Sequence, residues 1–89
     1  MKIILNKCFG GFGVSDEACK RFGLTNLSEE NLRTNPELIS AIESGEDVND
    51  DYSELAVINI PDTATDYYVD EYDGLETLIY VVEGKLYWA

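Results

Sequence analysis

The chain has 89 residues and a mass of 10.0 kDa, which is the size of one domain. Its 18 acidic and 6 basic residues, with no histidine, give a net charge of −12, so we do not expect it to bind nucleic acid or an anionic membrane surface directly. A hydrophobic content of 45% argues against wholesale disorder.

The first part of the chain predicts a strand followed by a glycine-rich loop. Ile3–Cys8 carries apolar residues on both faces, which indicates an inner strand of a sheet. Gly10–Gly13 lies between this strand and a helix, where phosphate-binding loops occur, but it lacks the residues that complete such motifs. A glycine turn that needs positive φ is the simpler interpretation.

Two short helices are predicted next. Ser15 is a candidate N-cap and Gly23 a stop, which places the first helix at Asp16–Phe22. Asn35 followed by a proline starts a second helix over Pro36–Ser44. Between them, Ser28 could start a single helical turn.

The remaining residues predict strands at Leu55–Ile60, Asp66–Tyr72, Leu78–Val82 and Lys85–Trp88. The sum is one α+β domain over residues 1–89, with two short helices packed on a mostly antiparallel sheet of about five strands. We expect one core, formed by Ile3, Leu5, Ile39, Ile42, Val57, Ile58, Ile60, Ile79, Val81 and Trp88.

The charge is unevenly distributed along the chain. Residues 1–35 hold four acids and five bases, whereas residues 36–89 hold fourteen acids and one base, Lys85. Solubility needs a net charge of only about 2–8, so the surplus of this acidic C-terminal half favours an interaction surface over a merely solvated one. Acids of the near-neutral segment, such as Glu29 and Glu30, are expected to matter much less for binding.

Tyrosines among carboxylates suit a protein partner that is rich in arginine, because arginine can stack on the rings and pair with the acids. Asp66 and Asp70 alternate with Tyr68 and Tyr72 on one face of a predicted strand; the alternative is that these tyrosines form its buried face. The candidate partner-binding residues are Glu46, Asp47, Asp50, Asp51, Glu54, Asp66, Tyr68, Asp70, Glu71, Tyr72 and Asp73.

Catalytic and metal-binding signatures are weak. Histidine, the commonest general base and zinc ligand, is absent, and Cys8 and Cys19 are best interpreted as small hydrophobic residues. Asp47–Ser53 spaces oxygen ligands like a calcium loop but lacks the required glycine and the final glutamate. We therefore expect no catalytic residues, no metal and no cofactor.

The location is expected to be the cytoplasm. Two cysteines do not make a disulfide framework, and the three apolar residues Ile3–Leu5 are too few for a signal peptide or a membrane span.

Four segments resemble a family of small, uncharacterised bacteriophage and prophage proteins: Lys7–Ser15, Arg33–Ile39, Ile58–Asp62 and Glu71–Glu76. The resemblance implies a phage-encoded protein that acts in the cytoplasm of a bacterial host, and it carries no activity or catalytic residue with it. Members of the family often end in a short basic stretch, whereas Leu78–Trp88 here is apolar, with Lys85 its one base.

The leading hypothesis is a non-enzymatic anti-defence protein, similar to anti-CRISPR proteins, that mimics nucleic acid and binds the basic channel of a host effector such as a Cas nuclease. Three alternatives stay open. The glycine loop with Arg33 or Lys20 could bind an anion such as a nucleotide, a sheet edge could join phage structural proteins, or the acidic connector could serve a metal-dependent enzyme. The oligomeric state, monomer or homodimer, is left open.

Overall fold

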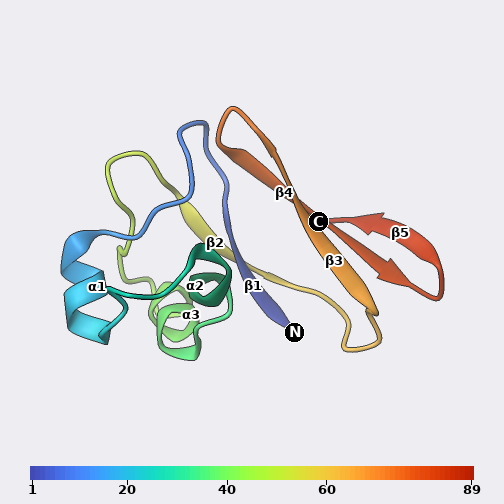
Figure 1. The fold of residues 1–89 in the computed structure, drawn as a ribbon, viewed down its shortest axis with the longest axis horizontal. Coiled ribbons are helices and arrows are strands. Elements are labelled where there is room, and N and C mark those ends of the chain that lie inside the picture. The colour runs from blue at the N-terminus through green and yellow to red at the C-terminus, as the bar shows by residue number, and fades with distance from the viewer.

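The computed structural model describes residues 1–89 and confirms an α+β fold. Three short helices and five strands follow one another along the chain (Figure 1). Their bounds are β1 Lys2–Asn6, α1 Asp16–Phe22, α2 Glu29–Arg33, α3 Pro36–Glu43, β2 Leu55–Asn59, β3 Asp66–Tyr72, β4 Leu75–Val82 and β5 Lys85–Trp88.

The helices begin where the sequence predicts. The side chain of Ser15 accepts a hydrogen bond from the amide of Ala18, and Asn35 caps α3 in the same way through Leu38. Gly23 ends α1 with a φ of 67°, a conformation that costs glycine little. Ser28 caps the extra helix α2, so the helical turn left open by the sequence does form.

The five strands form two antiparallel sheets rather than one. β1 pairs only with β2, and β3, β4 and β5 form the second sheet in that order. Figure 1 shows the helices on one side of the β1–β2 pair and the three-stranded sheet on the other. No helix of this structure is long and apolar enough to cross a membrane.

The two faces of β1 serve two separate hydrophobic clusters. Ile4 packs with the helices, together with Leu38 and Val48, whereas Ile3 and Leu5 point to the other face. That second cluster includes Leu78 of β4 and Ile60. Because alternate strand residues face opposite sides, three consecutive apolar residues fill both clusters.

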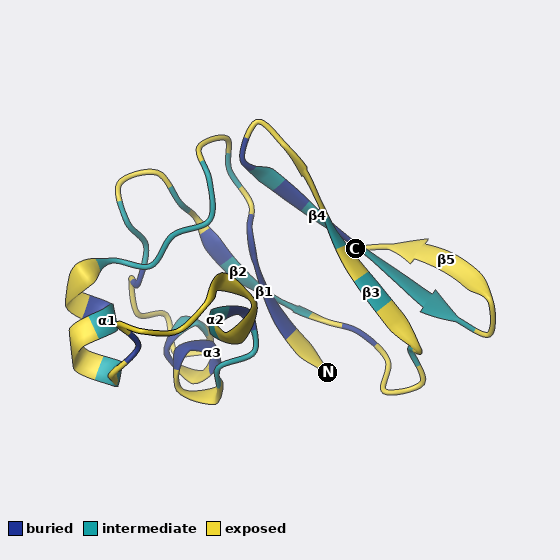
Figure 2. Cartoon of the chain, viewed as in Figure 1, coloured by how far each residue is buried: buried dark blue, intermediate teal, exposed yellow.

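The prediction of a single core that includes Trp88 is wrong. Trp88 is 64% exposed, and Ile79 and Val81 are only half-buried. β5 is the edge strand of the second sheet and no layer covers its outer face, so it is exposed along its whole length (Figure 2). The sequence predicts an apolar hairpin here, but it does not show which face of the hairpin another layer covers.

Candidate protein-binding face

The alternating acids and tyrosines of β3 lie on its solvent-exposed face. Tyr67 and Val69 point inwards and pack against the second hydrophobic cluster. Tyr68 and Tyr72 point the other way and are 51% and 78% exposed, so the alternative that they form the buried face is wrong. Asp66 and Asp70 are exposed beside them. We call these four residues, Asp66, Tyr68, Asp70 and Tyr72, the β3 face.

A hydrogen bond orders one end of the β3 face. The Tyr68 hydroxyl donates to Asp66 Oδ2 over 3.1 Å. This hydrogen bond, and the negative charge of Asp66 behind it, raise the pKa of Tyr68 above its ordinary value. The hydrogen bond holds the hydroxyl beside Asp66 while about half of the Tyr68 side chain remains exposed.

The acids of the connector Glu46–Glu54 do not all face solvent freely. Glu46 forms an ion pair with Arg21 of α1, and Asp47 accepts hydrogen bonds from Asn49 within the loop. Asp50 accepts from the amide of Tyr52 and lies against the backbone of the glycine loop. The remaining acids of the connector are exposed and make no side-chain hydrogen bond: Asp51 and Glu54.

The glycine loop joins the connector to the β3–β4 turn. The Cys8 thiol lies 3.5 Å from the carbonyl oxygen of Tyr52, and the amide of Gly10 donates to the carbonyl of Asp73 over 3.1 Å. A Cβ on Gly74 would lie 2.5 Å from the backbone of Gly10, so glycine is needed at this approach. The loop therefore brings Tyr52 of the connector and Asp73 of the turn to the same end of the molecule.

Glu71 is on the opposite face of β3 from the β3 face. Its carboxylate accepts a hydrogen bond from the amide of Gly74 and closes the turn. Both residues line a hollow of about 400 Å³ next to the glycine loop. Glu71 and Asp73 therefore contribute to the acidic turn rather than to the row of Asp66 and Asp70.

The near-neutral first part of the chain is not separate from the acidic face. Glu29 and Glu30 of α2 line one hollow together with Asp66 and Tyr67 of β3. The expectation that these two glutamates matter much less for binding stays a prediction, although they line a hollow together with one of the candidate binding residues. Helix α2 was only an open alternative in the sequence, so its position against β3 could not be foreseen.

A buried ion pair that sequence reasoning missed lies beside this face. Arg33 Nη1 donates to Glu76 Oε1 over 2.8 Å and Nη2 to Glu76 Oε2 over 2.6 Å. The side chains are 8% and 5% exposed. The Phe12 ring covers the guanidinium with its centroid 4.2 Å away, a cation–π geometry. Arg33 and Glu76 each lie in one of the four segments that resemble the phage family, but no sequence pattern indicates that they form a pair.

Arg33 is not available to bind an anion. Burial lowers its pKa, but hydrogen bonds and charge from Glu76 and Glu29 outweigh burial and raise the pKa above its ordinary value. The adjoining 400 Å³ hollow is lined by Glu29, Glu71 and Glu76 with Arg33 as its one base. A phosphate there would meet three carboxylates and a guanidinium that is already paired, which argues against the anion-binding alternative.

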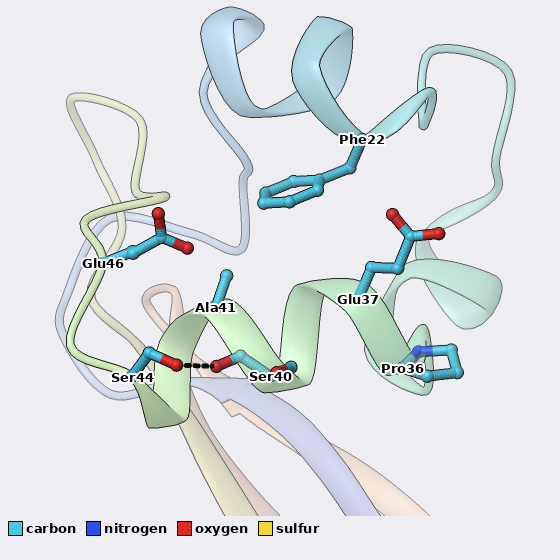
Figure 3. Close-up of a pocket in the computed structure, with 7 residues that line it drawn as sticks. All are labelled: Phe22, Pro36, Glu37, Ser40, Ala41, Ser44 and Glu46. Atoms are coloured by element: carbon cyan, nitrogen blue, oxygen red, sulfur yellow. Dashed lines mark hydrogen bonds between the residues drawn. The ribbon is translucent and has the colours of Figure 1, made fainter.

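A third hollow, of about 360 Å³, separates α1 from α3. Figure 3 shows Phe22 of α1 pointing towards Ala41 of α3, with the carboxylates of Glu37 and Glu46 on either side. Ser44 donates to the backbone carbonyl of Ser40 and is thereby used within the helix. The hollow has no basic residue and no nucleophile with an activating partner.

The possible metal ligands of the chain are its carboxylates and its two thiols. No group of three or more acidic or cysteine side chains lies close enough to hold a metal ion. Burial, and then the charge of Asp16, raise the pKa of Cys19, which disfavours its thiolate. Cys8 donates to Asn6 Oδ1 over 3.4 Å and has no basic neighbour among its hydrogen-bond partners.

No protein-family model matches the chain, and no significant match was found among curated proteins or solved structures. The resemblance to phage proteins therefore stays a prediction from the four sequence segments.

Proposed function

We propose that the chain is a non-enzymatic binding protein that occupies the basic nucleic-acid-binding surface of another protein. The observation that carries the proposal is the β3 face, where Asp66, Tyr68, Asp70 and Tyr72 are all exposed on one side of one strand. In the phage setting that the sequence resemblance implies, the partner is a host defence protein such as a CRISPR effector, and the chain is its inhibitor.

The total charge supports an electrostatic mode of binding. The chain carries a net charge of −12 within a body of 40 × 26 × 24 Å. Duplex DNA of the same length carries about one charge per 1.7 Å of axis, roughly 24 charges over 40 Å. The protein therefore has about half the linear charge density of a duplex, enough to be attracted strongly to a channel lined with Lys and Arg.

The spacing of the acids decides what kind of mimic this is. Asp66 and Asp70 are four residues apart on an extended strand, or about 13 Å. One DNA strand carries about one phosphate per 3.4 Å of helix axis, or about four in that length. The β3 face therefore carries fewer charges per unit length than a DNA strand, and the proposed mimicry is of the negative field rather than of a full row of phosphates.

The tyrosines supply the second part of the contact. Tyr68 and Tyr72 alternate with the acids and present ring surface to solvent. Arginine side chains in nucleic-acid channels stack on flat rings and pair with carboxylates, so one arginine can engage a tyrosine and its neighbouring aspartate together. This geometry favours a protein partner over a small ligand, because both rings lie exposed on the surface of the strand.

The test is competition. Tagged protein is incubated with lysate of a bacterial host, and the captured partner is challenged with nucleic acid and with salt. We expect nucleic acid to release the partner, and affinity to fall steeply as salt is raised. A captured partner that binds nucleic acid and this protein at the same time would contradict the proposal.

A further inference from the structure

The three-stranded sheet has two free edges that differ in their protection. The free edge of β3 carries Asp66, Asp70 and Glu71 among its seven residues, and charges on an edge strand discourage pairing with another chain. β5 carries one charge, Lys85, at its first position, followed by Leu86, Tyr87 and Trp88. These three apolar residues are 53%, 42% and 64% exposed.

The backbone of β5 is ready to pair. Leu78 and Ala89 exchange two hydrogen bonds of 3.0 and 2.8 Å across β4 and β5. Hydrogen-bonded pairs alternate along an antiparallel ladder, so the next such pair is Tyr80 with Tyr87. The backbone amides and carbonyls of Leu86 and Trp88 therefore point away from β4, towards the open edge, with no protein partner.

We propose that the β5 edge pairs with the β5 edge of a second copy, forming an antiparallel homodimer with a continuous six-stranded sheet. In the symmetric register Leu86 faces Trp88 of the other copy and Tyr87 faces its own counterpart on the twofold axis. The four backbone groups of Leu86 and Trp88 are then all satisfied. The inference does not rest on the partner proposed above, because it uses the free backbone groups of β5 rather than the acids and tyrosines of the β3 face.

Charge is the reason for choosing a second copy as the occupant. Residues 77–89 contain Glu83 and Lys85 as their only charges, so this hairpin is the neutral part of a chain with a net charge of −12. Figure 1 shows β5 at one end of the long axis and α1 at the opposite end, with the connector on the side of α1. Pairing through β5 therefore keeps most acids of the two copies separated by more than the Debye length of about 8 Å.

The exposed area sets the strength of the dimer. Aromatic side chains present about 150–250 Å² each, so the exposed parts of Leu86, Tyr87 and Trp88 from two copies amount to several hundred Å². Stable specific complexes bury about 1,200–2,000 Å². We therefore expect a weak dimer that dissociates on dilution.

Sedimentation analysis of the whole chain, from low micromolar to millimolar concentration, tests this proposal. We expect a monomer–dimer equilibrium that salt strengthens, because salt screens the repulsion between two acidic copies. Leu86→Pro removes the amide that faces the open edge and no hydrogen bond to β4, so it should abolish the dimer. Leu86→Val keeps that amide and is the matched control.

Cross-linking gives a second readout that does not depend on how well Leu86→Pro folds. In a Cys8→Ser, Cys19→Ser background, Tyr87→Cys should form a disulfide-linked dimer on oxidation, because Tyr87 faces itself across the axis. Leu86→Cys should cross-link far less, since it faces Trp88. A monomer at every concentration, a dimer that Leu86→Pro leaves unchanged, or equal cross-linking of the two cysteine variants would overturn the proposal.

The outcome also separates this proposal from the binding function. Asp66→Lys with Asp70→Lys changes the β3 face and should leave the dimer intact. Loss of partner binding with an unchanged dimer would locate the two functions on different strands of the sheet, whereas loss of the dimer in this variant would contradict pairing through β5.

Discussion

Arg33 and Glu76 are 43 positions apart in the sequence, and together they close the edge of β1 that faces away from β2. Arg33 Nη1 donates to the carbonyl of Ile4 over 3.0 Å, and Glu76 Oε1 accepts from the amide of Asn6 over 2.7 Å. These backbone groups would otherwise be buried without partners, because Ile4 and Asn6 are fully buried. The ion pair thus takes the place of a third strand beside β1 and explains why the strands form two sheets.

Removing one partner of this pair is therefore expected to be costly. Glu76→Ala leaves the Arg33 guanidinium with the exposed Glu29 as its only carboxylate partner and leaves the amide of Asn6 unpaired. The expected loss of stability is about 3–5 kcal/mol, the usual cost of an uncompensated buried charge. Glu29→Ala is the matched control, and it should cost about 1 kcal/mol or less because Glu29 is 61% exposed. Urea unfolding measures both, and equal losses would show that the buried pair has no special role.

The contact between the glycine loop and the β3–β4 turn makes a second prediction. Gly74 and Gly84 both have positive φ, 87° and 74°, so alanine at either site is strained by about 1–2 kcal/mol. Only at Gly74 would the added Cβ also collide with the backbone of Gly10, whereas nothing lies within 4 Å of Gly84. Gly74→Ala should therefore lower the free energy of unfolding clearly more than Gly84→Ala. A similar loss in both variants would mean that the glycine loop is not held against the turn.

Local signals in the sequence predict the elements of this fold well. Capping residues and glycine stops place α1 and α3, and alternation places Asp66–Tyr72 at the observed bounds of β3. Each of these signals depends on residues a few positions apart, so the local sequence is enough to predict where these two helices and this strand lie.

Long-range arrangement is what the sequence does not reveal. The Arg33–Glu76 pair depends on α2 and β4 both packing against β1, which also places Glu29 and Asp66 at the lining of one hollow. The exposure of Trp88 depends on β5 having no layer above it. Alternation along the strand was enough to predict the β3 face. It could not show that Glu46 pairs with a residue of α1 or that Asp50 lies against the glycine loop, because these contacts join distant parts of the chain.

The hydrogen bond between Tyr68 and Asp66 predicts a late-titrating tyrosine. Its folded pKa lies above the unfolded value, so the contribution of this bond to stability is present below the unfolded pKa of about 10 and is lost as pH rises through the folded pKa. Absorbance of the phenolate should show a step above the ordinary range that Tyr68→Phe removes. Asp66→Ala should return it to the ordinary range, whereas Asp70→Ala should not. An unchanged titration in Asp66→Ala would show that the bond does not persist in solution.

Charge reversal on the β3 face and at Asp51 of the connector tests how the chain binds its partner. Asp51→Lys and Asp70→Lys should each change stability by about 0.5 kcal/mol or less, because these residues are exposed, and Asp66→Lys by about 1 kcal/mol, because it also removes the hydrogen bonds from Tyr68 and from the amide of Tyr67. Asp50 is left unchanged, since its carboxylate accepts from the amide of Tyr52 and shapes the connector. Affinity for the captured partner should fall by several kcal/mol as attraction becomes repulsion, with the largest difference from wild type at low salt.

The control for that experiment must carry the same change of charge elsewhere on the molecule. Glu29 and Glu30 are unsuitable, because they share a hollow with Asp66. Glu17, Glu37 and Glu43 lie on helices α1 and α3, away from the β3 face, and all three are exposed. Reversing these three to lysine alters the net charge equally, so any effect of overall charge appears in both triple variants. Binding lost only in the Asp51, Asp66 and Asp70 variant would support the β3 face as the contact. Equal losses in both variants would mean that the net charge alone weakens binding, and would contradict a defined binding face.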